Sequence, residues 1–306
     1  MQAFFTKILI LFLKGQIIAF VKAFFTALLL AFFVFGKIFA DCPVQCKDAN
    51  LEQKTMRVIS LSPSTTDIIF SINAQNCLVA VSKFCKLPEN FRHLPQIGGI
   101  IDPNYERIAS LKPDLLIIAS KNCPEIERRL DSLKIRHISL FGDGFDNIPK
   151  NVMLVADALN KTKEGEKVAG ELREKKRLAI ENSAGKRRPK CIFMFDKMAA
   201  GKNSFAGEIL EYAGATNCAG SGTNAWFVPQ KEFVLLANPE VIIVEAKDEC
   251  DFALKKEFYL KDPIWSKTKA VKSGKIFYIA SDIICMPSPK VLLGLKRVCE
   301  IVENCR

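Results

Sequence analysis

Two segments of this chain share one pattern: residues 106–118 read ERIASLKPDLLII, and residues 232–244 read EFVLLANPEVIIV. Each begins with an acid, runs through a short amphipathic stretch to a proline and a second acid, and ends in an apolar run. The two segments align without a gap at an offset of 126 residues. A continuous apolar run is typical of a parallel strand covered on both faces, so each segment predicts a short helix followed by a buried strand.

A second pair of segments supports an internal repeat. Asp67-Ile-Ile with Ala74-Gln-Asn-Cys77 matches Glu208-Ile-Leu with Ala215-Thr-Asn-Cys218 at an offset of 141 residues. Similarity within one chain indicates a structural unit that is present twice. We therefore expect an α/β fold of two similar lobes with mostly parallel sheets, and a ligand-binding cleft between the lobes.

The segment between the two units favours one long helix. From Lys163 to Ser183 it holds helix-forming residues and no proline, which predicts a rigid rod of roughly 30 Å that joins the lobes. The predicted division is a first lobe over 57–146, a linking helix region over 147–185 and a second lobe over 186–306.

Three helix starts follow from capping residues. Ser64 with Asp67 three residues later resembles a capping box, which places the start of a helix there. Ser204 is a candidate cap in the second lobe. Ser288-Pro289 combines an N-cap serine with a proline at the first helical position, which predicts the start of the last helix.

Residues 1–40 predict a secretion signal, because they carry four lysines, no acid, an apolar core and a small residue at Ala40. Residues 41–56 are polar and form a leader. Export places the protein in the periplasm, where disulfides between the eleven cysteines persist. Cys42 and Cys46 are candidates to pair, and the odd total predicts at least one free thiol. The alternative is that an uncleaved segment tethers the protein to the inner membrane.

Charge and composition exclude several functions. Removing residues 1–40 lowers the net charge from +11 to +7, and the basic residues form no stripe interleaved with aromatics, so a nucleic-acid partner is not expected. The chain has only two histidines, His93 and His137, too few for a three-histidine metal site. No phosphate-binding glycine loop or GxSxG motif occurs. The sequence therefore favours binding over catalysis, with no catalytic residue, no metal site and no resident cofactor.

The loops that follow strands carry the candidate ligand-binding residues, because α/β proteins bind ligands beyond the carboxyl ends of their strands. Aromatic side chains at Phe84, Trp226 and Phe227 offer flat apolar surfaces for a large flat ligand. The full set is Ser62, Pro63, Ser64, Phe84, Ile100, Ile101, Asn203, Trp226, Phe227, Asp282 and Met286.

Glu106 and Glu232 are equivalent acids of the two repeats, each near a predicted helix start. One interpretation is helix capping, since the helix dipole favours acids at this end. The other is a matched pair of surface carboxylates that contact arginines of a partner.

Four segments together resemble the periplasmic binding proteins for vitamin B12 and ferric siderophores: Arg57-Val-Ile-Ser-Leu-Ser-Pro-Ser, residues 104–118, residues 226–239 and Ser288-Pro-Lys290. The resemblance runs from about Arg57 to the C-terminus. It implies two α/β lobes joined by one long helix, and delivery of the ligand to a membrane ABC importer.

The same resemblance implies roles for single residues. Glu106 and Glu232 stand where the family's docking glutamates meet arginines of the permease dimer, and Trp226 and Asp282 stand at cleft positions. Two departures concern the ligand: Ile100 replaces an aromatic residue of cobalamin-binding members, and Met286 replaces an arginine.

We therefore expect a monomeric solute-binding subunit of an ABC importer that captures a corrinoid, whose cobalt belongs to the ligand. A ferric siderophore or heme is the alternative ligand within the same family. An exported enzyme with a cysteine nucleophile is an alternative of another class, disfavoured by the scarcity of histidine. A membrane-anchored structural or sensory module is a third.

Overall fold

The computed structural model describes residues 55–119, 124–220 and 224–306. Residues Thr55–Arg306 form one compact unit. The predicted signal segment and nearly all of the leader, with Cys42 and Cys46, lie outside the described residues. Within the described ranges, no helix combines the length and apolarity that a membrane span requires.

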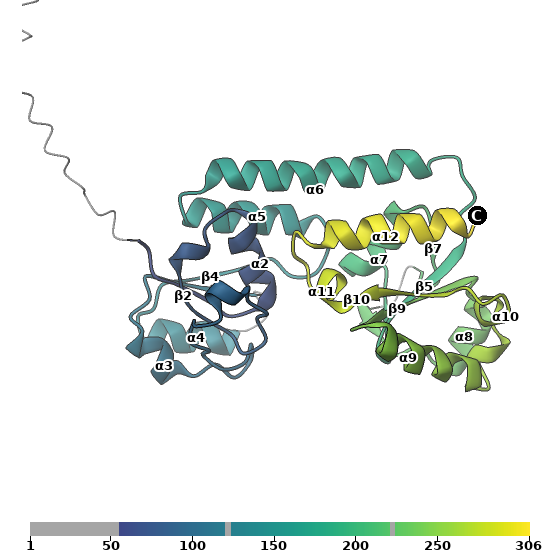
Figure 1. The fold of residues 1–306 in the computed structure, drawn as a ribbon, viewed down its shortest axis with the longest axis horizontal. Helices are drawn as coiled ribbons and strands as arrows, with labels where there is room; N and C mark the ends of the chain where they lie inside the picture. The colour runs from purple at the N-terminus through teal and green to yellow at the C-terminus, as the bar shows by residue number, and fades with distance from the viewer. Residues whose placement is uncertain (1–54, 120–123, 221–223) are drawn as a thin grey trace, which may run out of the picture. The chain divides into compact units, whose positions relative to one another are not determined.

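The first lobe is built on a four-stranded sheet in which every strand is parallel to its neighbours. The strand order is β2-β1-β3-β4, with helices on both faces (Figure 1). Its elements are β1 (Val58–Ser60), α2 (Pro63–Ser71), η1 (Gln75–Cys77), β2 (Leu78–Val81), η2 (Glu89–Phe91), α3 (Tyr105–Ser110), β3 (Leu115–Ile118), α4 (Pro124–Ser132) and β4 (His137–Ser139).

Alternation of side chains along the strands explains why both faces are covered. Val58 and Leu115 are buried in a cluster with α2 and α5 (Asn147–Ala158), whereas their neighbours Ile59 and Leu116 are buried in a second cluster with α3 and α4. Successive strand residues point to opposite faces, so an unbroken apolar run feeds both clusters. The buried strand predicted after Pro113 is confirmed.

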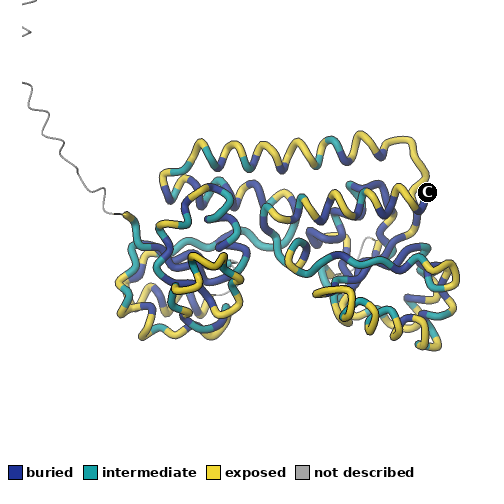
Figure 2. Tube along the Cα trace, viewed as in Figure 1, coloured by how far each residue is buried: buried dark blue, intermediate teal, exposed yellow. Residues whose placement is uncertain are grey.

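Two helices, not one, follow the first sheet. The long helix predicted from Lys163 to Ser183 is confirmed as α6 (Thr162–Ser183), which at 1.5 Å per residue is about 33 Å long. The chain before it forms α5, and a turn with Asn160 at φ 57° separates the two. Asparagine tolerates this left-handed conformation better than most residues. Figure 2 shows that α6 exposes much of its surface.

The second lobe repeats the first sheet and extends it. Strands β7, β5, β9 and β10 are parallel in the order β7-β5-β9-β10, which is the order of the first sheet, while β6 and β8 add an antiparallel edge. Its elements are β5 (Lys190–Phe195), β6 (Met198–Ala200), α7 (Phe205–Tyr212), β7 (Thr216–Asn217), β8 (Trp226–Phe227), α8 (Lys231–Ala237), β9 (Val241–Ala246), α9 (Glu249–Lys261), η3 (Trp265–Lys267), α10 (Lys269–Lys272), β10 (Ile276–Ala280), α11 (Ser281–Ile284) and α12 (Val291–Asn304).

The repeat seen in the sequence is also present in backbone geometry. Lys112 and Asn238, 126 residues apart, both adopt the left-handed conformation after their helices, at φ 44° and 42°. Two residues later, Asp114 accepts a hydrogen bond from the amide of Arg57 at 2.8 Å, and Glu240 accepts one from the amide of Lys190 at 3.5 Å. The prediction of two similar α/β lobes is confirmed.

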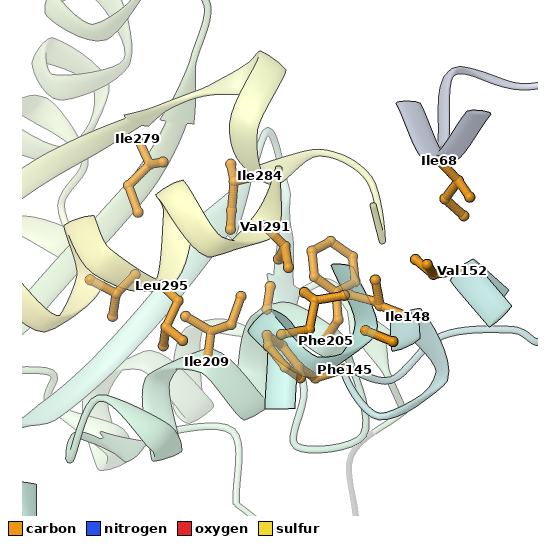
Figure 3. Close-up of a cluster of buried hydrophobic side chains, with 14 of the residues drawn as sticks. Ile68, Phe145, Ile148, Val152, Phe205, Ile209, Ile279, Ile284, Val291 and Leu295 are labelled. Carbon is orange, nitrogen blue, oxygen red and sulfur yellow. The ribbon is translucent and has the colours of Figure 1, made fainter. Parts of the chain in front are cut away.

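One hydrophobic cluster extends through both lobes (Figure 3). It includes Ile68 of α2, Ile148 of α5, Phe205 of α7 and Val291 of α12, each at most 3% exposed. The linking helices therefore contribute to a core that the lobes share, rather than forming an isolated rod.

Two of the predicted helix starts are wrong. α2 is capped by Ser62, whose hydroxyl accepts from the Thr65 amide at 3.2 Å, and not by Ser64. The last helix begins at Val291, because the hydroxyl of Ser288 instead donates to Asp67 at 3.1 Å. The cap at Ser204 is confirmed.

The prediction of disulfides is not confirmed among the described residues. All eight cysteines among the described residues are unpaired, and they range from the buried Cys191 to the exposed Cys250 and Cys285.

Candidate functional site

A pocket of about 180 Å³ lies between the two lobes. The first lobe lines it with α2 and the loop after β2, and the second lobe lines it with α11 and the segment that leads to α12. Four of its residues, Pro63, Phe84, Asp282 and Met286, belong to the predicted ligand-binding set. The full lining is Pro63, Thr66, Asp67, Phe84, Cys85, Lys86, Ser281, Asp282, Cys285, Met286 and Lys290.

Strand ends explain why these residues meet. β1 ends three residues before the start of α2, β2 ends three residues before Phe84, and β10 leads directly into α11. The carboxyl ends of parallel strands lie at one edge of a sheet, where α/β proteins place their ligands. The pocket is therefore where the carboxyl ends of strands in the two sheets approach each other.

Asp67 links the lobes across this pocket. Its Oδ1 lies 2.7 Å from Nζ of Lys290, and its Oδ2 accepts from the Ser288 hydroxyl at 3.1 Å. The Asp67 side chain is 13% exposed and that of Lys290 is 48% exposed. A half-exposed ion pair contributes only about 0–1 kcal/mol, so this link holds the lobes together weakly.

The pocket also offers apolar and sulfur-containing side chains. Phe84 is 53% exposed, and Nζ of Lys83 lies 5.2 Å from its ring centroid. Cys85 Sγ lies 3.2 Å from Thr66 Oγ1 and 3.3 Å from Ser82 Oγ. On the opposite lobe, burial and then the nearby Glu245 carboxylate raise the pKa of the Cys285 thiol to about 12, so this thiol is protonated at neutral pH.

Trp226 does not line this pocket. Its indole nitrogen donates to Asp143 at 2.6 Å, and its ring packs on Phe195 and Phe205 at centroid distances of 4.9 and 6.0 Å. The neighbouring Phe227 packs edge-on against Phe233. Trp226 and Phe227 are each only half-buried, and their predicted contacts with a ligand stay predictions.

The other predicted ligand residues lie apart from the pocket or below its surface. Ser62 and Ser64 are buried at the start of α2, with a hydroxyl–hydroxyl distance of 2.9 Å. Ile101 is 81% exposed, Ile100 is half-buried and Asn203 is exposed just before α7. None of these positions lines the inter-lobe pocket, so their roles in ligand binding stay predictions.

Glu106 and Glu232 occupy the first turns of α3 and α8, and both are exposed. Asn104 caps α3 by accepting from the Arg107 amide at 2.9 Å, and Gln230 at the start of α8 makes no side-chain cap. Neither glutamate pairs with another described residue, which leaves both carboxylates available to a partner.

Two larger hollows contain none of the predicted residues. One, of about 440 Å³, lies between the ends of β5 and β9 and helix α9, and its lining includes the exposed Leu254 and Phe258. The other, of about 680 Å³, is a polar groove between α6 and α12. No group of three or more histidine, cysteine and acidic side chains is placed to hold a metal within the described ranges.

The predicted set lacks seven residues of the pocket lining: Thr66, Asp67, Cys85, Lys86, Ser281, Cys285 and Lys290. Cys85 and Lys86 directly follow Phe84, so the same loop argument could have included them. Asp67 and Lys290 are 223 positions apart in the sequence, and no local pattern indicates that they form a pair.

A family model described as periplasmic binding protein matches residues 58–283. The chain belongs to this family. The predicted family is confirmed, and membership places the chain among solute-binding proteins of transporters rather than among enzymes.

Relatives of this periplasmic binding protein share most of its length. The vitamin B12-binding protein of Photorhabdus laumondii is 24% identical over 263 residues, which cover 83% of this chain and 90% of that protein. Among solved structures, the periplasmic vitamin B12 binding protein BtuF of Vibrio cholerae has a TM-score of 0.70 at 21% identity, covering 81% of this chain and 97% of that one. The periplasmic heme binding protein HutB of Vibrio cholerae has a TM-score of 0.72 at 19% identity, covering 81% and 98%. At these identities the two structures establish the shared fold.

Proposed function

We propose that this protein is the exported solute-binding subunit of an ABC importer and that it captures a corrinoid between its lobes. The observation that carries the proposal is the pocket that both lobes line. A ligand held there contacts both halves at once, as a protein that captures and later releases a solute requires. The similarity to a vitamin B12-binding protein supports a corrinoid as the ligand.

The chemistry of the pocket fits a large ligand with a flat apolar body and polar edges. Phe84, Pro63 and Met286 supply apolar surface, which stabilises a bound ligand by roughly 25 cal/mol per Å² removed from water. Lys86 and Asp282 add one charge of each sign beyond the Asp67–Lys290 pair. The ammonium group of Lys86 suits a phosphate group of a corrinoid, and the carboxylate of Asp282 suits an amide N–H of its side chains.

The size of the pocket sets a condition on binding. Its volume of about 180 Å³ is below the roughly 300–1,000 Å³ common for small-molecule sites. A corrinoid would therefore place only part of its ring in the pocket unless the lobes separate. The weak Asp67–Lys290 link is compatible with a small separation of this kind, although the shared core opposes a wide one.

A ligand screen tests this proposal. Cyanocobalamin, cobinamide, hemin and a ferric hydroxamate are each added to the purified protein, and the melting temperature and heat of binding are measured. We expect cyanocobalamin to raise the melting temperature, because a ligand that binds only the folded state stabilises it. A response to hemin or the hydroxamate alone would reassign the ligand, and no response to any of the four would contradict the proposal.

Phe84→Ala provides the matched variant. Loss of this ring is expected to weaken cyanocobalamin binding roughly tenfold, a change of about 1.4 kcal/mol. Phe258→Ala is the control, because Phe258 is 55% exposed, close to the 53% of Phe84, and lies on α9 outside the pocket. Equal losses in both variants would argue against a ligand in the inter-lobe pocket.

A further inference from the structure

The hollow beside helix α9 belongs to the second lobe alone (Figure 1). It has a volume of about 440 Å³ between the ends of β5 and β9 and helix α9, and we call it the α9 hollow. None of the residues that line it also lines the inter-lobe pocket. Sites for small molecules commonly measure roughly 300–1,000 Å³, so the α9 hollow is large enough for a ligand of its own.

Two nearly buried side chains of the α9 hollow carry polar atoms without a partner. Tyr259 is 3% exposed and Trp265 is 7% exposed, and their rings meet edge to face at a centroid distance of 5.1 Å. Among the described residues, nothing hydrogen-bonds to the Tyr259 hydroxyl or to the Trp265 indole N–H, and neither atom is sealed off from solvent. Since buried polar groups are normally paired, these two donors require an acceptor from outside the fold.

Opposite charges at the edge of the α9 hollow cancel each other. Asp196 and Lys197 are exposed in the turn between β5 and β6, and neither side chain makes a hydrogen bond or ion pair with a described residue. The other charged pair is already satisfied, because Nζ of Lys255 lies 3.1 Å from a carboxylate oxygen of Glu245 and 2.7 Å from its carbonyl oxygen. The free groups are thus one carboxylate and one ammonium, which together favour an uncharged ligand.

The Tyr259 hydroxyl is a neutral donor at pH 7. Burial, and then the nearby Asp196 carboxylate, raise its pKa. Both groups line the same hollow, which therefore presents a donor and an acceptor close together. A ligand group that both accepts and donates matches this pair, whereas a group that only accepts leaves Asp196 unpaired.

Exposed apolar side chains also line the α9 hollow. Leu254 and Phe258 lie one turn apart on α9 and are 69% and 55% exposed, and Val228 after β8 is 56% exposed. A flat ring that covers them removes apolar surface from water, which favours binding. The body of the ligand is therefore expected to be apolar and aromatic.

We propose that the α9 hollow binds a small uncharged molecule with an aromatic body and an amide group. The amide oxygen has two lone pairs and accepts from the Tyr259 hydroxyl and the Trp265 N–H, while the amide N–H donates to Asp196. A carboxylate in this place would meet the like charge of Asp196, and an ammonium group would leave both buried donors unpaired. This site goes beyond the proposed function, since one lobe binds its ligand, which is not the solute held between the two.

Titration of the whole protein with naphthalene-2-carboxamide, a two-ring aromatic amide, tests the site. The chain has two tryptophans, so nitrogen-15 labelling gives two indole N–H signals, and Trp226→Phe assigns them. We expect the Trp265 signal to shift until it saturates, while the Trp226 signal stays in place. Naphthalene-2-carboxylate should bind about tenfold more weakly, because its charge repels that of Asp196.

Two substitutions separate the roles of the polar groups. Tyr259→Phe removes only the unpaired hydroxyl and should weaken carboxamide binding about fivefold. Tyr278→Phe is its control, because Tyr278 lies on β10 and does not line the hollow. Asp196→Asn keeps an acceptor and a residue type that tolerates the backbone φ of 50° at this position, and it should reduce the preference for carboxamide over carboxylate.

Four outcomes would overturn the assignment. The first is an unmoved Trp265 signal at the highest soluble concentration of carboxamide, and the second is equal affinity for carboxamide and carboxylate. The third is an equal loss of affinity in the two tyrosine variants. The fourth is displacement of the carboxamide by cyanocobalamin, which would make the hollow part of the inter-lobe site. A lack of cyanocobalamin binding would refute the proposed function alone, since the α9 hollow does not depend on it.

Discussion

Asp67 and Glu208 occupy equivalent positions of the two repeats, one on α2 and one on α7. Each acid ties its helix to a segment distant in sequence. Asp67 meets Lys290 and Ser288 of the second lobe, and Glu208 accepts from the amide of Phe145, just before α5. The two repeats thus carry an acid at the equivalent helical position, but the two acids contact different partners.

Glu208 predicts a pH dependence of stability. Burial, and then the nearby Asp146, raise its pKa, although the Phe145 amide opposes the shift. A carboxyl whose pKa is higher in the folded state binds more protons when folded, so its contribution to stability falls as the pH rises from its unfolded pKa through its folded one. Glu208→Gln is therefore expected to raise the melting temperature at pH 7, by an amount that shrinks as the pH approaches 4.

Thermal melts from pH 4 to pH 8 measure this difference. Glu171→Gln is the control, because Glu171 is an exposed residue of α6 with no ion pair among the described residues. A gain in Glu208→Gln that is the same at all pH values would contradict the assignment of the raised pKa.

Only some residues of the candidate site can be predicted from the local sequence. Phe84 and Met286 could be predicted because each lies just beyond a predicted strand or in the loop region that follows one. The Trp226–Asp143 hydrogen bond could not, since it joins residues 83 positions apart. The burial of Ser62 and Ser64 also depends on tertiary packing, which a local capping pattern does not reveal.

Helices α5 and α6 pack closely because of one glycine. A Cβ built on Gly165 of α6 would lie 2.4 Å from the Cβ of Ala156 on α5, whereas a Cβ on Gly170 would meet nothing within 4 Å. The close packing of α6 on α5 therefore requires a glycine at position 165 but not at position 170.

These two glycines give opposite predictions. Gly165→Ala should lower the free energy of unfolding by about 1–3 kcal/mol, because the added methyl group forces the helices apart. Gly170→Ala should raise it by about 0.5–1 kcal/mol, since alanine favours the helix. Urea denaturation measures both, and a stabilising Gly165→Ala would show that the interface accommodates the methyl group.

Helices and strands could be predicted where one local feature of the sequence, such as an unbroken apolar run, decides the structure. The apolar runs at β3 and β9 are buried on both faces, so their positions follow from composition alone. The separation of α5 from α6 was missed because neither proline nor glycine marks it; the chain turns at Asn160 instead. The start of α12 was misplaced because a tertiary contact with Asp67 takes the hydroxyl that local rules assign to capping.

The whole molecule is expected to move little on binding. α5 and α6 bury side chains in the same cluster as α2, α7 and α12, so wide hinge motion would expose part of this core. We predict only a small change in the X-ray scattering radius when ligand is added. A large compaction would show that the lobes close over a wide angle despite the shared core.

Docking to the importer is predicted to depend on the exposed pair Glu106 and Glu232. Replacing both by alanine should abolish ligand uptake into vesicles that contain the permease, while solution affinity for the ligand stays the same. Glu125→Ala with Glu249→Ala is the matched control, because these exposed acids also occupy first helical turns, one in each lobe. Reduced solution affinity in Glu106→Ala with Glu232→Ala would count against a docking role.

The cluster that runs from Ile68 to Val291 has a further consequence for how the chain exists in the cell. Neither half buries this core alone. A polypeptide cut between the repeats would therefore leave two fragments with exposed hydrophobic surface, and not two smaller binding modules. We therefore expect neither lobe to fold completely until both repeats have been synthesised.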